Sequence, residues 1–180
     1  WTSSPYLGSP NFNVGLAPVL LVLSGLRGIG MNPEFAFKTL HFLLLMVSAF
    51  GAWQLVRTLM PKAGPWLGLA AAIFFIANPY TITAGATLAI ALPMAFLPWM
   101  LWCFVHALKR PNSWTWPALA GVAFFLMSGM NVAVVPLFSL LAIIPLVVAL
   151  WRDFGLTWLR VTVVLAKSAF FVVLFSLYWL

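Results

Sequence analysis

Charge is the scarcest component of this 180-residue sequence, and negative charge is scarcer still. Only 6% of the residues are charged, and Asp and Glu together number 2 against 9 Lys and Arg. No charged residue lies between Ala63 and Leu108, and none lies between Pro111 and Trp151. About 20 apolar residues of helix are enough to cross the hydrocarbon of a bilayer. The lack of charge therefore excludes a soluble domain and predicts an all-α, polytopic transmembrane helical bundle.

Residues for catalysis or metal binding are also few. The single Cys103 cannot form an internal disulfide. The sequence has no Ser/His/Asp set, no Cys/His metal spacing and no glycine-rich phosphate loop followed by Lys. His41 and His106 fall at opposite ends of their predicted helices, so no cofactor is identifiable and a divalent-metal requirement stays undefined. With Glu34 and Asp153 as the two acids, we expect this chain alone to be inactive.

What the chain has in abundance is apolar sequence, divided by Pro, Gly and Asn. Hydrophobic residues make up 64% of it, and the mean hydropathy is +1.10. The divisions predict about six spans preceded by a short interfacial helix over residues 14–26. The predicted spans cover residues 32–59, 66–77, 93–108, 116–128, 132–151 and 158–180.

The ends of the sequence suggest a piece of a longer protein. The chain opens on Trp1 instead of Met and stops at Leu180 inside an apolar run. We expect one transmembrane domain over residues 1–180, belonging to a larger membrane protein. Within it, 1–34 form an external loop with the interfacial helix, and 35–180 form the helical bundle.

Basic residues predict the orientation. Three alternate loops carry most of the positive charge, whereas the other side holds Arg27 and Lys38. The positive-inside rule places the basic loops in the cytoplasm of a multi-pass plasma-membrane protein, with 78–92 and 129–131 outside. The net charge of +7 is dispersed over helix ends, so the bilayer is the expected partner and nucleic acid is not. The basic-loop cations are Arg57, Lys62, Lys109, Arg110, Arg152 and Arg160.

Candidate binding residues gather on the predicted outer side. Asn32-Pro33-Glu34 is typical of a helix start, and Glu34, Lys38 and His41 then share one helix face. These residues form either a helix-start ion pair with an interfacial histidine or, together with Arg27, a patch for the phosphate of a lipid-linked substrate.

The outward segment 78–87 is unusually polar for its surroundings, since it carries Asn78, Tyr80, Thr81 and Thr83. Irregular backbone at membrane depth is tolerated when it is buried in protein or lines a cavity. The segment is therefore either a plain re-entrant turn or the wall of a polar substrate cavity. Trp99 is a candidate for stacking on a sugar, although most tryptophans fit an aromatic belt at the interfaces.

Lys167 lies within the last predicted span, where an ionisable residue indicates function by default. It follows Arg160 by seven positions, which is about 10 Å of helix. Its amine can therefore reach the basic side by snorkelling or bind a phosphate there.

The order of Pro, Gly and aromatic residues along the chain resembles that of a known enzyme family. Phe74 to Tyr80, then Gly85, Leu92-Pro93-Met94 and Leu97-Pro98-Trp99, look like the membrane domain of polyprenyl-phosphate-dependent GT-C glycosyltransferases. The nearest likeness is to the large actinobacterial α-(1→3)-arabinofuranosyltransferases. A turn at Gly129-Met130-Asn131 and an aromatic end at Tyr178-Trp179-Leu180 follow in similar order.

The resemblance implies transfer of a sugar, arabinofuranose in this family, from a polyprenyl-phosphate donor to a cell-wall polysaccharide outside the membrane. It also implies a catalytic acid in the first external loop, which we expect upstream of Trp1. Asn131 joins the expected substrate contacts on the same ground. A transporter or flippase, a non-catalytic assembly subunit and a GT-C enzyme for another sugar stay open as alternatives.

Overall fold

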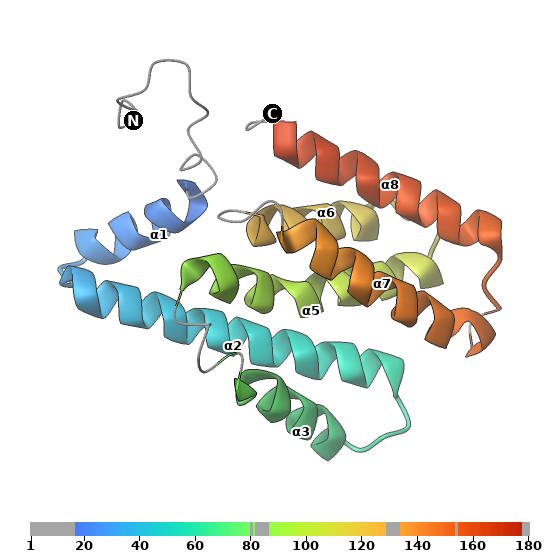
Figure 1. Cartoon of the computed structure of the whole chain (residues 1–180), viewed down its shortest axis with the longest axis horizontal. Coiled ribbons are helices and arrows are strands. Elements are labelled where there is room, and N and C mark those ends of the chain that lie inside the picture. Colours follow the sequence, from blue (N-terminus) through green and yellow to red (C-terminus); the bar gives the residue numbers. More distant parts are fainter. Residues whose placement is uncertain (1–16, 80, 82–86, 129–133, 154, 178–180) are drawn as a thin grey trace.

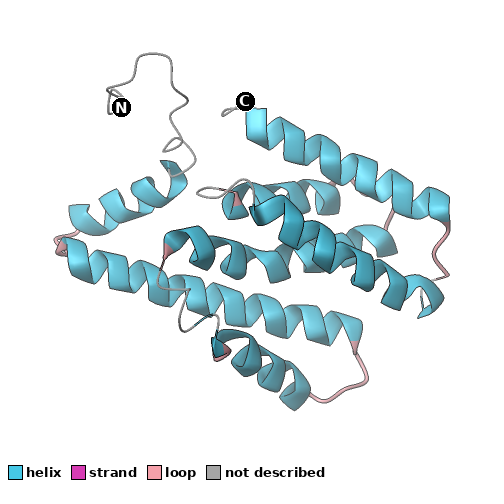
Figure 2. Ribbon diagram, in the orientation of Figure 1, coloured by secondary structure: helices cyan, strands magenta, loops and turns pink. Residues whose placement is uncertain are grey.

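The computed structural model describes residues 17–79, 81, 87–128, 134–153 and 155–177. Within these residues the protein has seven helices and no strand (Figure 2). The all-α class predicted from the sequence is confirmed. The helices are α1 (Ala17–Gly28), α2 (Pro33–Leu59), α3 (Pro65–Ile76), α5 (Leu88–Lys109), α6 (Thr115–Met127), α7 (Val134–Asp153) and α8 (Trp158–Ser176).

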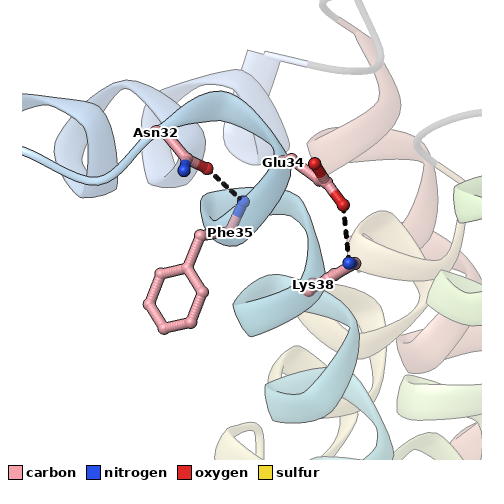
Figure 3. Close-up of polar contacts among 4 residues, drawn as sticks. All are labelled: Asn32, Glu34, Phe35 and Lys38. Atoms are coloured by element: carbon pink, nitrogen blue, oxygen red, sulfur yellow. Dashed lines mark hydrogen bonds and ion pairs between the residues drawn. The ribbon is translucent and has the colours of Figure 1, made fainter.

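Two helices begin at side-chain caps. The Asn32 side chain accepts a hydrogen bond from the Phe35 amide at 2.7 Å, and Pro33 occupies the first helical turn of α2 (Figure 3). The Thr157 hydroxyl accepts from the Arg160 amide at 3.3 Å at the start of α8. Each cap satisfies one of the amides that a helix start leaves without an intrahelical acceptor.

Helix length separates full spans from shorter pieces. Among the described residues, α2, α5 and α8 are long and apolar enough to cross a membrane. By contrast α3 has 12 residues and α6 has 13, which at 1.5 Å per residue is about 18–20 Å. That falls short of a hydrocarbon core of roughly 30 Å. The expected helices are therefore present, but six full spans are not confirmed.

The helices run up and down, so that alternate connections lie at the same end (Figure 1). α5 packs between α2 and α6, while α3 lies on α2 and α8 lies on α6. The end of α2, the start of α3, the 109–115 turn and the start of α8 share one end, on the right in Figure 1. We call it the basic end, because Arg57, Lys62, Lys109, Arg110 and Arg160 lie there. The start of α2 lies at the opposite end, with the start of α5 toward it, whereas the short α3 ends beside the middle of α2.

α5 begins at Leu88, five positions before its predicted start, and so includes Pro93 as well as Pro98. Proline has no N–H for the carbonyl four residues earlier, which leaves the Met94 carbonyl without its usual donor from Pro98. The Ser48 hydroxyl of α2 donates to this carbonyl at 3.2 Å. A neighbouring helix therefore supplies the hydrogen bond that the proline cannot, as transmembrane helices with internal proline require.

The same stretch of α2 accommodates Trp99 at close range. The Trp99 indole donates to the Val47 carbonyl at 2.9 Å. A Cβ atom on Gly51 would stand 2.7 Å from the Trp99 ring nitrogen, too close for any real contact. Glycine at position 51 thus permits the approach of α5 to α2, as small residues commonly do between transmembrane helices.

Candidate functional site

The opposite end of the bundle carries an exposed ion pair at the first turn of α2. The Lys38 amine lies 2.6 Å from a Glu34 carboxylate oxygen, and the two side chains are 71% and 77% exposed (Figure 3). The predicted i,i+4 pair is therefore confirmed. Ion pairs this exposed contribute little to stability, so either partner is available to an incoming charged group at small cost.

Two more predicted residues lie near this helix start. Arg27 is exposed in the last turn of α1, which packs on α2. The His41 ring lies against Phe37, with 4.3 Å between ring centroids, and its Nδ1 is 3.1 Å from the Phe37 carbonyl oxygen. Positive charge on α1 and α2 thus borders this end of the bundle.

The turn after α3 is held by its own polar groups. The Asn78 amide nitrogen donates to the Phe75 carbonyl at 2.6 Å and to the Thr81 hydroxyl at 2.8 Å, and its oxygen accepts from the Thr81 amide at 2.9 Å. The Thr81 hydroxyl donates to the Phe75 carbonyl at 3.1 Å. Asn78 and Thr81 therefore close the end of α3 and begin the next turn, which the re-entrant-turn alternative requires.

This turn and the Glu34–Lys38 pair lie at different depths. The Thr81 hydroxyl lies 3.8 Å from the Met94 sulfur, and the Met94 carbonyl bonds Ser48. Ten positions of α2 separate Ser48 from Lys38, which is about 15 Å along the axis. Because α3 is short, its end reaches only the middle of α2 (Figure 1). The Asn78–Thr81 turn is consequently recessed and does not touch the ion pair.

The other predicted contacts divide into two groups. Tyr80, Thr83 and Asn131 lie outside the described residues. Trp99 is half-buried near the middle of α5, and its ring meets Phe50 at 5.6 Å and Trp102 at 5.7 Å between centroids. The structure therefore places Trp99 inside the packing between α2 and α5.

At the basic end, basic side chains donate hydrogen bonds to backbone carbonyls at or just after the C-termini of α2 and α5. Lys109 donates to the Thr58 carbonyl at 3.3 Å and Arg160 to the Lys109 carbonyl at 2.9 Å. Lys167 donates to the Pro111 carbonyl at 2.7 Å and stands 4.6 Å from the centre of the Trp114 ring. Lys167 thus reaches toward the basic end, in agreement with the snorkelling alternative. Positive side chains suit these positions because a helix C-terminus carries partial negative charge.

Sequence patterns missed the polar contacts that join separate helices. Trp102 donates to the Thr58 hydroxyl at 2.9 Å, and the His106 ring stacks on Trp116 with 4.4 Å between centroids and 19° between planes. A hydroxyl within an apolar run is the one sequence signal for such contacts, and it does not name the partner. Within the described part of the chain, no three His, Cys, Asp or Glu residues gather as a metal site would require.

Comparison with known proteins identifies the fold family. Neither a curated protein nor a solved structure gives a significant match to the chain. A family model described as alpha-(1→3)-arabinofuranosyltransferase, N-terminal GT-C domain, matches residues 29–180, a range that holds every described helix after α1. Together with the apolar all-helical bundle, this match shows a membrane glycosyltransferase domain. The chain belongs to the alpha-(1→3)-arabinofuranosyltransferase family, as its N-terminal GT-C domain.

Proposed function

We propose that the protein transfers an arabinofuranosyl group from a polyprenyl-phosphate donor to a cell-wall polysaccharide. We further propose that transfer takes place on the extracytoplasmic face of the plasma membrane, at the opposite end of the bundle. The family match over residues 29–180 is the observation that carries the proposal. The orientation rests on the concentration of Lys and Arg at the basic end, which the positive-inside rule assigns to the cytoplasm.

The charge on the donor phosphate gives the cations of α1 and α2 a chemical role. In the transfer, the bond from the anomeric carbon to the phosphate oxygen breaks with its electron pair left on oxygen, and a hydroxyl of the acceptor bonds that carbon as its proton passes to a general base. A phosphodiester with one negative charge becomes a monoester with up to two. Cations placed at this phosphate therefore stabilise the transition state more than the ground state. Lys38 and Arg27, with His41 beside them, are the residues we assign to it.

The Glu34–Lys38 pair fits this role because it is weak and exposed. When the donor arrives, Lys38 exchanges the Glu34 carboxylate for a phosphate oxygen, whose negative charge rises as the bond to the sugar breaks, and Glu34 is left in solvent. Before the substrate binds, the ion pair with Glu34 keeps the Lys38 side chain oriented along one face of α2. The prenyl chain then lies in the bilayer beside α2, whose exposed apolar residues on the same stretch include Phe35 and Phe42.

For the sugar we propose contacts from the recessed segment. Asn78 and Thr81 shape the turn through their mutual hydrogen bonds. Tyr80 and Thr83 from the same segment, and Asn131, which follows α6 in the sequence, are candidate sugar contacts. Trp99 lies inside the α2–α5 packing, where its hydrogen bond to the Val47 carbonyl helps to hold α5 against α2. The catalytic acid is not assigned to any of these residues.

The test is a pair of charge substitutions in the full-length enzyme reconstituted in proteoliposomes. Lys38→Ala is expected to lower kcat/KM for the lipid-linked donor about tenfold, which corresponds to about 1.4 kcal/mol of transition-state stabilisation. Arg110→Ala removes an exposed cation at the basic end and should leave kcat/KM unchanged. Unchanged donor affinity and turnover in Lys38→Ala would remove the phosphate role from this residue.

A further inference from the structure

An apolar cavity lies between α2, α3 and α5, far from the Glu34–Lys38 pair and on the inner side of the Asn78–Thr81 turn, which bonds the Phe75 carbonyl. Its volume is about 260 Å³, and no polar atom contributes to its surface. Ala52 and Leu55 form its α2 wall, Ala71 and Phe75 its α3 wall, and Leu97 and Pro98 its α5 wall. Apolar cavities of about 150 Å³ stay dry and admit hydrocarbons. A cavity of this size and lining is therefore suited to a hydrocarbon chain and not to water or a sugar.

The depth of the cavity indicates from which side a chain would enter. Ala52 and Leu55 lie in the last third of α2, and Leu97 and Pro98 lie 12 and 11 positions before the end of α5, so the cavity extends over about 10–18 Å from the basic end by helix rise. The Glu34–Lys38 pair, at the first turn of the same 27-residue helix, lies much farther away. Phe74, which also lines the cavity, is 79% exposed. The opening therefore faces the lipid beside α2 and α3.

Two basic residues lie along the contact between α2 and α3, toward the basic end. The Arg57 guanidinium stands 4.9 Å from the centre of the Trp53 ring, and both residues lie against α3 at Gly68, where a Cβ atom would come within 2.6 Å of Trp53 and 3.3 Å of Arg57. Lys62, in the turn between α2 and α3, is exposed. An anionic headgroup at this turn would meet both cations while its chain reached the cavity.

From this combination we propose that the α2–α3–α5 cavity binds one acyl chain of an anionic phospholipid of the basic-side leaflet, whose phosphate is bound by Arg57 and Lys62. Lipid tails are as apolar as the cavity wall, so a chain gains little from the hydrophobic effect on leaving the bilayer. Selectivity therefore comes from the headgroup, because basic residues near the membrane surface attract anionic lipids. The chain fills space that would otherwise leave the wall atoms without contacts.

The experiment measures lipid retention by native mass spectrometry of the full-length protein, with dioleoyl phosphatidylglycerol and dioleoyl phosphatidylcholine as probes. Wild type is expected to retain one phosphatidylglycerol in preference to phosphatidylcholine. Ala71→Leu, which fills the cavity, and Arg57→Gln, which removes the charge, should each lower this retention at least fivefold. Ala70→Leu adds the same side chain at the neighbouring exposed position of α3 and should retain the lipid as wild type does.

A photolabelling measurement keeps the proposal testable if a variant fails to fold. Phosphatidylglycerol with a diazirine midway along one chain should label wild-type α2, α3 or α5 at the cavity wall. Labelling confined to other helices would overturn the proposal, as would equal retention of the two lipids or full retention by Ala71→Leu. Displacement of phosphatidylglycerol by an equimolar polyprenyl phosphate would also overturn it, because the cavity would then belong to the glycosyl donor.

Discussion

The two ends of this bundle are built differently. At the basic end, Lys109 and Arg160 bond carbonyls at the ends of α2 and α5, and Lys167 crosses from α8 to the 109–115 turn. At the opposite end, the described cations Lys38 and Arg27 are exposed, and Lys38 pairs with a carboxylate that is itself 77% exposed. Cations that bond helix carbonyls join the elements of the bundle. Cations left at an exposed rim remain available to a charged ligand.

The contrast extends to how closely the helices approach. α6 meets α8 at the middle of α6, where a Cβ atom on Gly121 would lie 2.7 Å from the Phe171 Cβ and 3.1 Å from its backbone carbonyl carbon. On α1, which precedes the opposite end, a Cβ atom on Gly25 would meet nothing within 4 Å. The fold therefore depends on glycine at position 121 for contact and has no steric need for it at position 25.

Among the substitutions that test this comparison, Gly121→Ala is expected to lower the stability of the protein most. The new methyl group meets near-backbone atoms of Phe171 that cannot rotate away, so α8 must shift, at a cost of about 1–3 kcal/mol for an overpacked site. We expect a clear fall in the thermal unfolding temperature of the full-length protein in detergent.

Gly25→Ala is the control for that measurement, since alanine is favoured over glycine inside a helix by roughly 1 kcal/mol. Its unfolding temperature should stay equal or rise. Equal losses from the two substitutions would mean that α6 and α8 are not in the close contact described here.

A second effect, of comparable size, tests the hydrogen-bonded Asn78–Thr81 turn that lies recessed from the opposite end. Asn78→Ala removes three hydrogen bonds and leaves the Thr81 amide without its side-chain acceptor. Loss of a partner by a buried polar group costs about 1–3 kcal/mol, and Thr81 is buried. Proteolysis of the full-length protein near residue 78 should speed up, whereas Asn112→Ala, at an exposed asparagine of the basic end, should leave the pattern unchanged.

The smallest effect compares one arginine from each end. Arg160→Gln loses the charged donor to the Lys109 carbonyl at an exposed helix end, which we expect to lower the free energy of unfolding by about 1 kcal/mol, the net contribution of a typical intramolecular hydrogen bond. Arg27→Gln changes an exposed side chain and should leave it unaltered. The measurement is chemical unfolding in mixed micelles at two salt concentrations. A loss from Arg27→Gln as large as that from Arg160→Gln would erase the distinction between the two ends.

The sequence predicted the helices well and their partners poorly. Runs bounded by Pro, Gly and Asn located each helix to within a few residues, because these residues act locally on the backbone. The exception is the start of α5, since the sequence pattern predicts a helix from Pro93 and the helix in fact starts at Leu88. A proline inside a helix depends on neighbouring helices for compensation, and periodicity does not contain that information.

Site prediction shows the same limit. The Glu34–Lys38 pair depends on i,i+4 spacing alone, and its prediction is confirmed. The recess of the Asn78–Thr81 turn depends on the difference in length between α2 and α3 and on Met94 contacting both Ser48 and Thr81. Those contacts are long-range, so no local pattern could have placed the turn about 15 Å from Lys38.

The hydrogen bond from Ser48 to Met94 has a consequence for biogenesis. During synthesis α2 is made before α5, and α5 enters the membrane with a carbonyl that its own backbone cannot satisfy beside Pro98. An unsatisfied carbonyl in hydrocarbon costs several kcal/mol, so α5 is most stable when it leaves the insertion machinery already beside α2. The order of insertion and the pairing of helices are thereby linked by a single serine.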